Sequence, residues 1–232
     1  MPANRPPRTS GPTPRTATPQ PLSTLVGRAA ELATLASALS DADAGHGRTV
    51  LVVGESGIGK THLVTAFAEQ AASRGFTVAI GRTYPVEQGV PYAVFSDALL
   101  PVLRNVEPSV LTLLSRGGMA ELTQLFPALA TGGERTPAVR GDPTELKARL
   151  FWNFSQFLSR FAAKRPLLLV LENLQWADSA SLETLHFVAR QITNDRIVLV
   201  GTHNDPDHRG SSALRATDRS LRSLGNAQRV RL

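Results

Sequence analysis

The sequence predicts an α/β fold with helices on both faces of a central parallel β-sheet. Short apolar runs alternate with segments of helical periodicity along most of the chain. Two of these runs, residues 167–171 and 197–200, are apolar throughout, which is typical of strands buried on both faces of a sheet. A glycine-rich segment follows another apolar run, residues 49–53, and leads directly into a helical segment. These observations favour parallel strands joined by right-handed helical crossovers.

The N-terminal residues 1–21 differ from the rest of the chain. They are dominated by Pro, Thr and Arg and cannot bury enough apolar surface to fold, so we predict a disordered tail. Residues 22–232 are predicted to form the core domain. Its first elements are predicted to be a helix, a loop and a strand, at residues 22–40, 41–47 and 49–53.

The same alternation continues towards the C-terminus. After the glycine-rich segment we predict a helix, a strand and a loop, at residues 60–73, 76–80 and 81–91. Helices 92–106 and 108–114, an irregular stretch 117–142 with room for a short helix, and a long amphipathic helix 143–163 form a helical insert after the second strand. The last elements are the strand 167–171, a helix 179–191, the strand 197–200, a helix 211–224 and a strand 228–232.

Composition and charge exclude several classes of protein. The 232 residues include no cysteine, so disulfides and cysteine nucleophiles are excluded, and a cytoplasmic location fits. No apolar run reaches the length of a membrane span, so we expect no membrane partner. The net charge is +6, and many of the arginines lie near the two ends of the chain without forming one compact run. Without a compact basic run, we do not expect direct DNA binding by this chain.

The glycine-rich segment matches the phosphate-binding pattern G-x-x-x-x-G-K-[ST], here Gly54, Glu55, Ser56, Gly57, Ile58, Gly59, Lys60 and Thr61, followed by His62. Its glycines let the backbone approach phosphates closely, and its amides form an anion-binding nest at a helix N-terminus. Lys60 is expected to reach the β- and γ-phosphates, and the Thr61 hydroxyl to ligate Mg²⁺. We therefore predict a P-loop NTPase fold with three layers, binding ATP or ADP together with Mg²⁺.

A P-loop ATPase also needs an acidic group at the end of a neighbouring strand. The run 167–171 continues into Glu172, Asn173, Leu174, Gln175, Trp176, Ala177 and Asp178. This segment resembles the signature of the STAND-type, AAA-related (Orc1-like) ATPase domains at the N-terminus of large LuxR-type transcriptional regulators. Residues 25–28, 91–92 and 198–202 are similar to other motifs of that family, and the resemblance covers about residues 22–232. It implies an ASCE-type sheet and a role in transcription regulation.

The sequence departs from this family at two positions. The family has two acidic residues where this chain has Glu172 and Asn173, and an amide cannot take a proton from water. The family's sensor strand continues Gly-Thr-Tyr-Arg, whereas here Asn204 stands in place of the arginine. The resemblance implies that Glu172, Asn173, Gln175 and Asn204 occupy the catalytic positions, with Thr61 and Glu172 as Mg²⁺ ligands. We therefore expect a switch that binds ATP and hydrolyses it weakly or not at all.

Two further residues have alternative interpretations. Arg28 resembles a nucleotide-contacting residue of the family, although an arginine at a helix start is often only solvated. Asp178 precedes Ser-x-x-Glu, so we favour a helix N-cap over a role beside the metal.

Other functions remain as alternatives: an active Mg²⁺-dependent ATPase, a P-loop small-molecule kinase, or a scaffold with a vestigial P-loop. A GTPase would need an Asn-Lys-x-Asp motif, which the sequence lacks. The family's helical lid, repeat region and helix-turn-helix fall outside these residues, which implies a fragment, an engineered variant or a natural truncation. Expected partners are therefore the other domains of a larger regulator, or a second copy of the chain.

Overall fold

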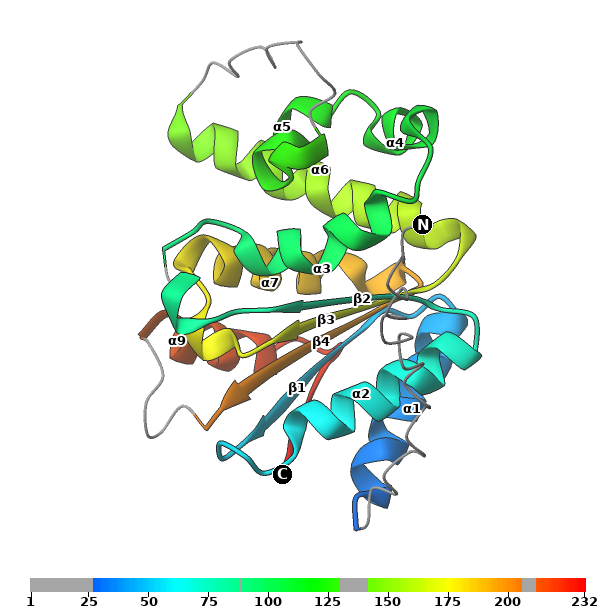
Figure 1. Ribbon diagram of the computed structural model, residues 1–232, viewed down its shortest axis with the longest axis vertical. Coiled ribbons are helices and arrows are strands. Elements are labelled where there is room, and N and C mark those ends of the chain that lie inside the picture. Colours follow the sequence, from blue (N-terminus) through cyan, green and yellow to red (C-terminus); the bar gives the residue numbers. More distant parts are fainter. Residues whose placement is uncertain (1–26, 88, 130–141, 206–211) are drawn as a thin grey trace, which may run out of the picture.

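A five-stranded parallel sheet forms the centre of the protein (Figure 1). The computed structural model describes residues 27–87, 89–129, 142–205 and 212–232, so the predicted tail 1–21 lies outside the described residues. In chain order the strands are β1 (Arg48–Gly54), β2 (Thr77–Arg82), β3 (Leu167–Glu172), β4 (Ile197–Asn204) and β5 (Ala227–Arg231). Their spatial order is β2-β3-β4-β1-β5, and every neighbouring pair is parallel. Strand β4 therefore separates the strand before the P-loop from the acidic strand.

Side chains alternate between two apolar cores along the central strands. On β3, Leu168 and Val170 face one core, whereas Leu167, Leu169 and Leu171 face the other. Strands β1 and β4 alternate in the same way. Burial on both faces explains why these runs are apolar throughout.

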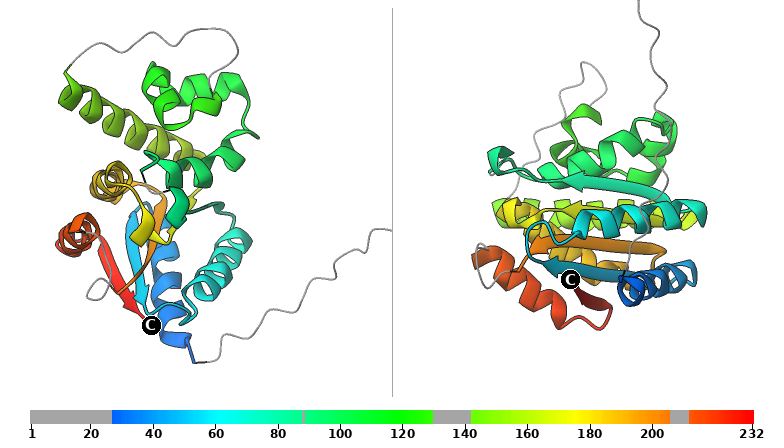
Figure 2. Two further views of the ribbon diagram at one scale, coloured as in Figure 1. Left: turned by 60° about the vertical axis from the view of Figure 1, so that its left-hand side comes forward. Right: turned by 60° about the horizontal axis from the view of Figure 1, so that its bottom comes forward.

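Helices cover both faces of the sheet, which gives three layers (Figure 2). On one face lie α1 (Ala29–Asp43) and α2 (Lys60–Ser73), and on the other lie α3 (Ala93–Leu103), α7 (Ser179–Gln191) and α9 (Ser212–Arg222). Gly81 allows α3 to approach β2, because a Cβ atom there would lie 2.2 Å from the carbonyl oxygen of Val94. The three-layer α/β fold predicted from the sequence is confirmed.

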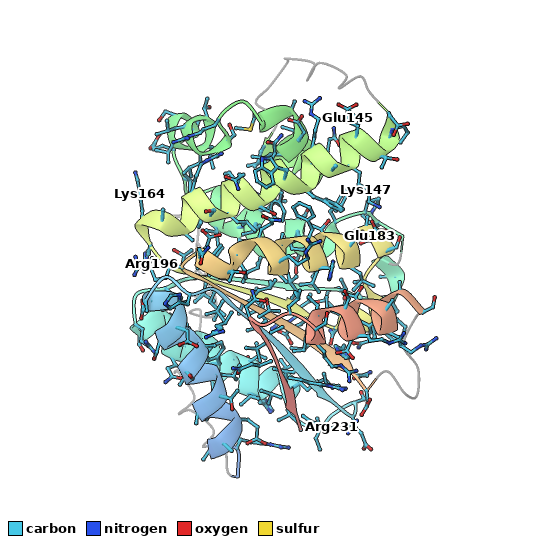
Figure 3. All side chains as sticks on the ribbon, turned by 180° about the vertical axis from the view of Figure 1, so that it is seen from behind. Glu145, Lys147, Lys164, Glu183, Arg196 and Arg231 are labelled. Carbon is cyan, nitrogen blue, oxygen red and sulfur yellow. The ribbon has the colours of Figure 1, made fainter. Side chains whose placement is uncertain are left out.

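The predicted insert begins with α3, which covers the sheet, and its remainder forms a helical group beyond α3 and α7, away from the sheet (Figure 1). It contains α4 (Pro108–Ser115), α5 (Met119–Leu125) and α6 (Pro143–Lys164). The Phe154 ring on α6 packs against Phe95 and Phe126, with ring centroids 5.3 and 5.9 Å away. Figure 3 shows Lys147 of α6 facing Glu183 of α7, and the two side chains form an ion pair. Within the described ranges, no helix is both long and apolar enough to cross a membrane.

Several element boundaries differ from those predicted. Helix α1 begins at Ala29, because Gly27 has a φ of 80° that a helix does not accommodate. The stretch 117–142 contains the helix α5, and β4 continues four residues beyond 200 to Asn204. Short 3₁₀ helices are η1 (Pro85–Glu87), η2 (Pro127–Leu129), η3 (Leu174–Trp176) and η4 (Ile192–Asn194).

Candidate functional site

The P-loop connects β1 to α2 at the carboxyl edge of the sheet. Gly57 and Gly59 have φ angles of 82° and 105°, which side chains with a Cβ rarely adopt. Gly59 is the N-cap of α2, so the first amides of the helix point out of its N-terminus. A cavity of about 320 Å³ lies there, lined by Ser56, Gly57, Gly59, Lys60, Thr61, His62, Asn173, Gln175 and Asn204. The structure thus brings most of the predicted site residues together around one cavity.

The Lys60 ammonium is held by neutral oxygen atoms. Its Nζ donates to the carbonyl oxygens of Gly54 and Glu55, at 3.0 and 2.9 Å, and to Oδ1 of Asn204 at 3.0 Å. Lys60 is buried, and this burial lowers the pKa of its ammonium below 10.5. None of its three partners carries a charge, so the positive charge of Lys60 is not compensated by them. A cation without a negatively charged partner at a helix N-terminus is suited to bind an anionic ligand.

The end of β4 lies directly beside the start of the P-loop, since Asn204 is in register with Gly54. The backbone amide of Asn204 donates to Oε1 of Gln175 at 3.3 Å, so these two predicted site residues also contact each other. Asn204 therefore lies between the P-loop lysine and the segment that follows β3.

The preceding residue, His203, faces the core instead of the cavity. Its Nδ1 donates to the Asn204 carbonyl oxygen at 2.7 Å, and its Nε2 lies 3.6 Å from Oδ1 of Asp218 on α9. Burial of Asp218 opposes its ionisation, but the nearby His203 and Arg222 side chains outweigh this and bring its pKa to about 2. These contacts connect the end of β4 to α9.

Glu172 lies at the end of β3, where it contacts the P-loop helix. Its Oε2 accepts a hydrogen bond of 2.8 Å from the Thr61 hydroxyl, and its Oε1 lies 3.0 Å from Nε of Arg82. The carboxylate is buried, with 2% of its side chain exposed. A hydroxyl and a carboxylate oxygen are ligands that Mg²⁺ accepts, and it usually keeps several waters beside one or two protein groups. The donor set of Thr61 and Glu172 therefore fits Mg²⁺.

Asn173 follows with a left-handed backbone, at a φ of 62°. Asparagine adopts this conformation more readily than most residues. Its backbone amide donates to Oγ1 of Thr202 at 3.0 Å, and its backbone carbonyl oxygen accepts from Oγ1 of Thr83 at 2.6 Å. Its side-chain Nδ2 lies 3.4 Å from the Thr83 carbonyl oxygen. These hydrogen bonds fix the backbone of Asn173, and its side chain lines the cavity.

The other predicted residues lie near the loop or serve the fold. Arg28 pairs with Glu31 at 3.0 Å and reaches the Ile58 carbonyl oxygen at 3.5 Å, so it contacts the P-loop backbone. Asp178 accepts a hydrogen bond from the amide of Ser181 at 2.9 Å and caps α7. The predicted N-cap is confirmed.

Sequence reasoning missed Arg82 and Thr83 at the end of β2. No motif marks them, and they reach the acidic strand because Arg82 is in register with Glu172. Only their position could have indicated them, because both follow the predicted strand 76–80 and so lie at the carboxyl ends of the strands, where the site is expected.

Comparisons with known proteins agree with this geometry. A family model described as the AAA ATPase domain matches residues 24–200, and no curated protein matches. Among solved structures, Cdc6p from Pyrobaculum aerophilum has a TM-score of 0.52 and 16% identity, over 91% of this chain and 47% of that chain. Orc1 from Aeropyrum pernix, solved in complex with DNA, has a TM-score of 0.43 and 19% identity, over 90% and 45%. AMPPCP-bound DnaA from Aquifex aeolicus has a TM-score of 0.41 and 13% identity, over 88% and 46%.

The chain spans about half the length of these three structures. At 16% identity, the likeness to Cdc6p shows the fold alone. The family model, by contrast, matches more than half of the 232 residues, including the P-loop, the acidic strand and the whole insert. This protein therefore belongs to the AAA ATPase domain family.

Proposed function

We propose that this AAA ATPase domain binds ATP and ADP and acts as a regulatory switch that hydrolyses ATP weakly or not at all. The observation that carries the proposal is the cavity at the N-terminus of α2, where the uncompensated charge of Lys60 meets the P-loop amides. Phosphates are the ligands that such an arrangement of amides and one cation recognises.

Binding is proposed to use the residues that line this cavity. The P-loop amides would hold the phosphates, and Lys60 would exchange its neutral oxygen partners for phosphate oxygens. Thr61 and Glu172 would hold Mg²⁺, which when bound neutralises charge on the phosphates. Arg28 lies against the loop backbone and is the proposed contact on the outer side.

Weak hydrolysis follows from the side chains available to activate water. Asn173 lines the cavity at the position of the second acid, and its amide cannot act as a general base. Both oxygens of Glu172 are engaged by Thr61 and Arg82. Gln175 and Asn204 are able to orient groups through hydrogen bonds but not to accept a proton at neutral pH.

The switch role is proposed from the segment that follows β3. Residues 174–178, Leu-Gln-Trp-Ala-Asp, resemble the STAND signature of LuxR-type transcriptional regulators. In that setting the domain would work in the cytoplasm and respond to ATP and ADP through other domains of a larger regulator, or through a second copy of the chain.

Nucleotide binding is tested by calorimetry of the purified chain with ATP and ADP. The Lys60→Ala variant should bind ATP at least about 30-fold more weakly, since losing one partner of a buried charged contact costs about 2 kcal/mol or more. Lys164→Ala, which removes an exposed lysine at the end of α6, is the matched control and should bind as the wild type does. Equal ATP affinity in all three proteins would refute binding through the P-loop.

Turnover separates the switch from the alternatives. The wild type should release phosphate from ATP slowly under conditions where calorimetry shows saturation. Brisk turnover that depends on Lys60 would instead support an active Mg²⁺-dependent ATPase. Phosphate transfer to an added small-molecule acceptor would support a kinase, which the Trp-Ala-Asp segment after β3 does not favour.

A further inference from the structure

Arg82 and Glu172 form the ion pair at the centre of this inference. The Glu172 side chain is only 2% exposed, and each of its oxygens has one protein partner. On one oxygen the partner is the neutral Thr61 hydroxyl, and on the other it is the Arg82 guanidinium. A buried carboxylate is costly unless it is paired, so Arg82 supplies the compensation that the hydroxyl cannot.

The fold holds Arg82 in this position from several directions. Arg82 and Glu172 are a registered pair on neighbouring parallel strands. The backbone amide of Arg82 donates to Oδ2 of Asp97 at 2.8 Å, which anchors the end of β2 to α3. The next residue, Thr83, donates through its hydroxyl to the carbonyl oxygens of Glu172 and Asn173, at 3.2 and 2.6 Å. The ends of β2 and β3 are thus built as one unit.

The P-loop lysine, Lys60, does not pair with the Glu172 carboxylate. The three partners of Lys60 are neutral oxygens, and none of them belongs to Glu172. Among the residues that the structure describes, Arg82 is the only cation ion-paired with Glu172. The two positive charges therefore have separate places: Lys60 at the cavity and Arg82 at the acidic strand.

From this separation we infer that Arg82 is a built-in counter-ion that stands in for the metal at Glu172 and makes ATP binding depend only weakly on Mg²⁺. The inference rests on the proposed binding of ATP in the P-loop cavity. Without a metal, a site lacking Arg82 would present an uncompensated buried carboxylate beside the phosphates, and the two negative charges would repel. With Arg82 present, that repulsion is offset whether or not Mg²⁺ is bound. Arg82 is a positioning residue, since it acts through Glu172.

The test measures ATP affinity by calorimetry in Mg²⁺ and in EDTA. For the wild type the two affinities should agree within about threefold, a small free-energy difference. For Arg82→Met, the affinity in EDTA should fall at least about tenfold, whereas the affinity in Mg²⁺ should stay close to that of the wild type. Arg82→Lys keeps the charge and should retain the weak dependence. Arg104→Met removes an exposed arginine at the end of α3 and is the matched control.

A second measurement does not require nucleotide. Mg²⁺ alone should raise the unfolding temperature of Arg82→Met, because the metal then supplies the missing counter-ion, and should leave that of the wild type unchanged. The unfolding transition also reports whether each variant is folded. If Arg82→Met shows the same Mg²⁺ dependence as the wild type in both measurements, or if the wild type binds ATP only with Mg²⁺, the inference is wrong. If the wild type binds no ATP in either buffer, the proposed function fails, and the unfolding measurement still decides the role of Arg82.

Discussion

Replacing Asn173 by aspartate should restore ATP hydrolysis. The side chain lines the cavity, and its backbone is fixed through Thr202 and Thr83, so an aspartate would occupy the same place. The substitution removes the long hydrogen bond of 3.4 Å from the Asn173 side-chain amide to the Thr83 carbonyl oxygen. Its removal should cost at most about 1 kcal/mol, which lowers the unfolding temperature of a domain of this size by roughly 2–4 °C.

The gain in turnover should be much larger than this cost in stability. A single well-placed electrostatic group at a reacting centre typically contributes about 10²–10³-fold in rate. Steady-state phosphate release from saturating ATP with Mg²⁺ measures the gain, with ATP affinity checked by calorimetry. Asn105→Asp is the matched control, because the Asn105 amide also donates to a carbonyl oxygen, that of Pro101 at 2.9 Å, on the insert. If Asn173→Asp turns over no faster than the wild type, Asn173 is not what limits hydrolysis.

Three further predictions concern the stability of the fold. Gly81→Ala should lower the free energy of unfolding in urea by more than about 2 kcal/mol, since its Cβ would overlap backbone atoms of α3, whereas Gly225→Ala, with open space around it, should be nearly neutral. Burial lowers the pKa of His186 below 6.5, and its Nε2 lies 2.8 Å from Oγ of Ser220. Because burial favours the neutral histidine in the folded state, stability present above pH 6.5 should fall as the pH drops through the folded pKa. Circular dichroism melts from pH 7.5 to 5 should show a smaller loss for His186→Gln than for the wild type. Asp218→Asn should cost about 2 kcal/mol in urea unfolding at pH 7, because the buried Asp218 carboxylate loses its charged hydrogen bond with the half-exposed Arg222; a cost below about 0.5 kcal/mol would contradict this.

Local signals were sufficient for the central strands and for the P-loop helix. Helix α2 has the predicted bounds 60–73, because glycine at its N-cap and Arg74-Gly75 at its end mark both termini. The runs that became β3 and β4 are short and apolar throughout, which suits a strand buried on both faces. The P-loop residues that line the cavity were likewise predicted from a local pattern, the G-x-x-x-x-G-K-[ST] motif.

Other features depend on contacts between distant segments. The last residues of β4, through Asn204, contain no apolar run and become strand only by pairing with β1. The pairing of Arg82 with Glu172 joins residues 90 positions apart and is set by strand register, which the sequence alone does not specify. The left-handed backbone of Asn173 likewise depends on hydrogen bonds that it accepts from Thr83 and donates to Thr202.

The order of the strands also decides how firmly each side of the site is attached. Strand β2 is an edge strand, hydrogen-bonded to the sheet through β3 alone, whereas β1 has neighbours on both sides. An edge strand opens locally at a lower free-energy cost than an internal one. Arg82, the ion-pair partner of Glu172, therefore sits on the more easily opened strand, and that strand leads through η1 to α3. Amide hydrogen exchange should be faster in β2 than in β1, so that Arg82 loosens while the phosphate-binding side of the site stays closed.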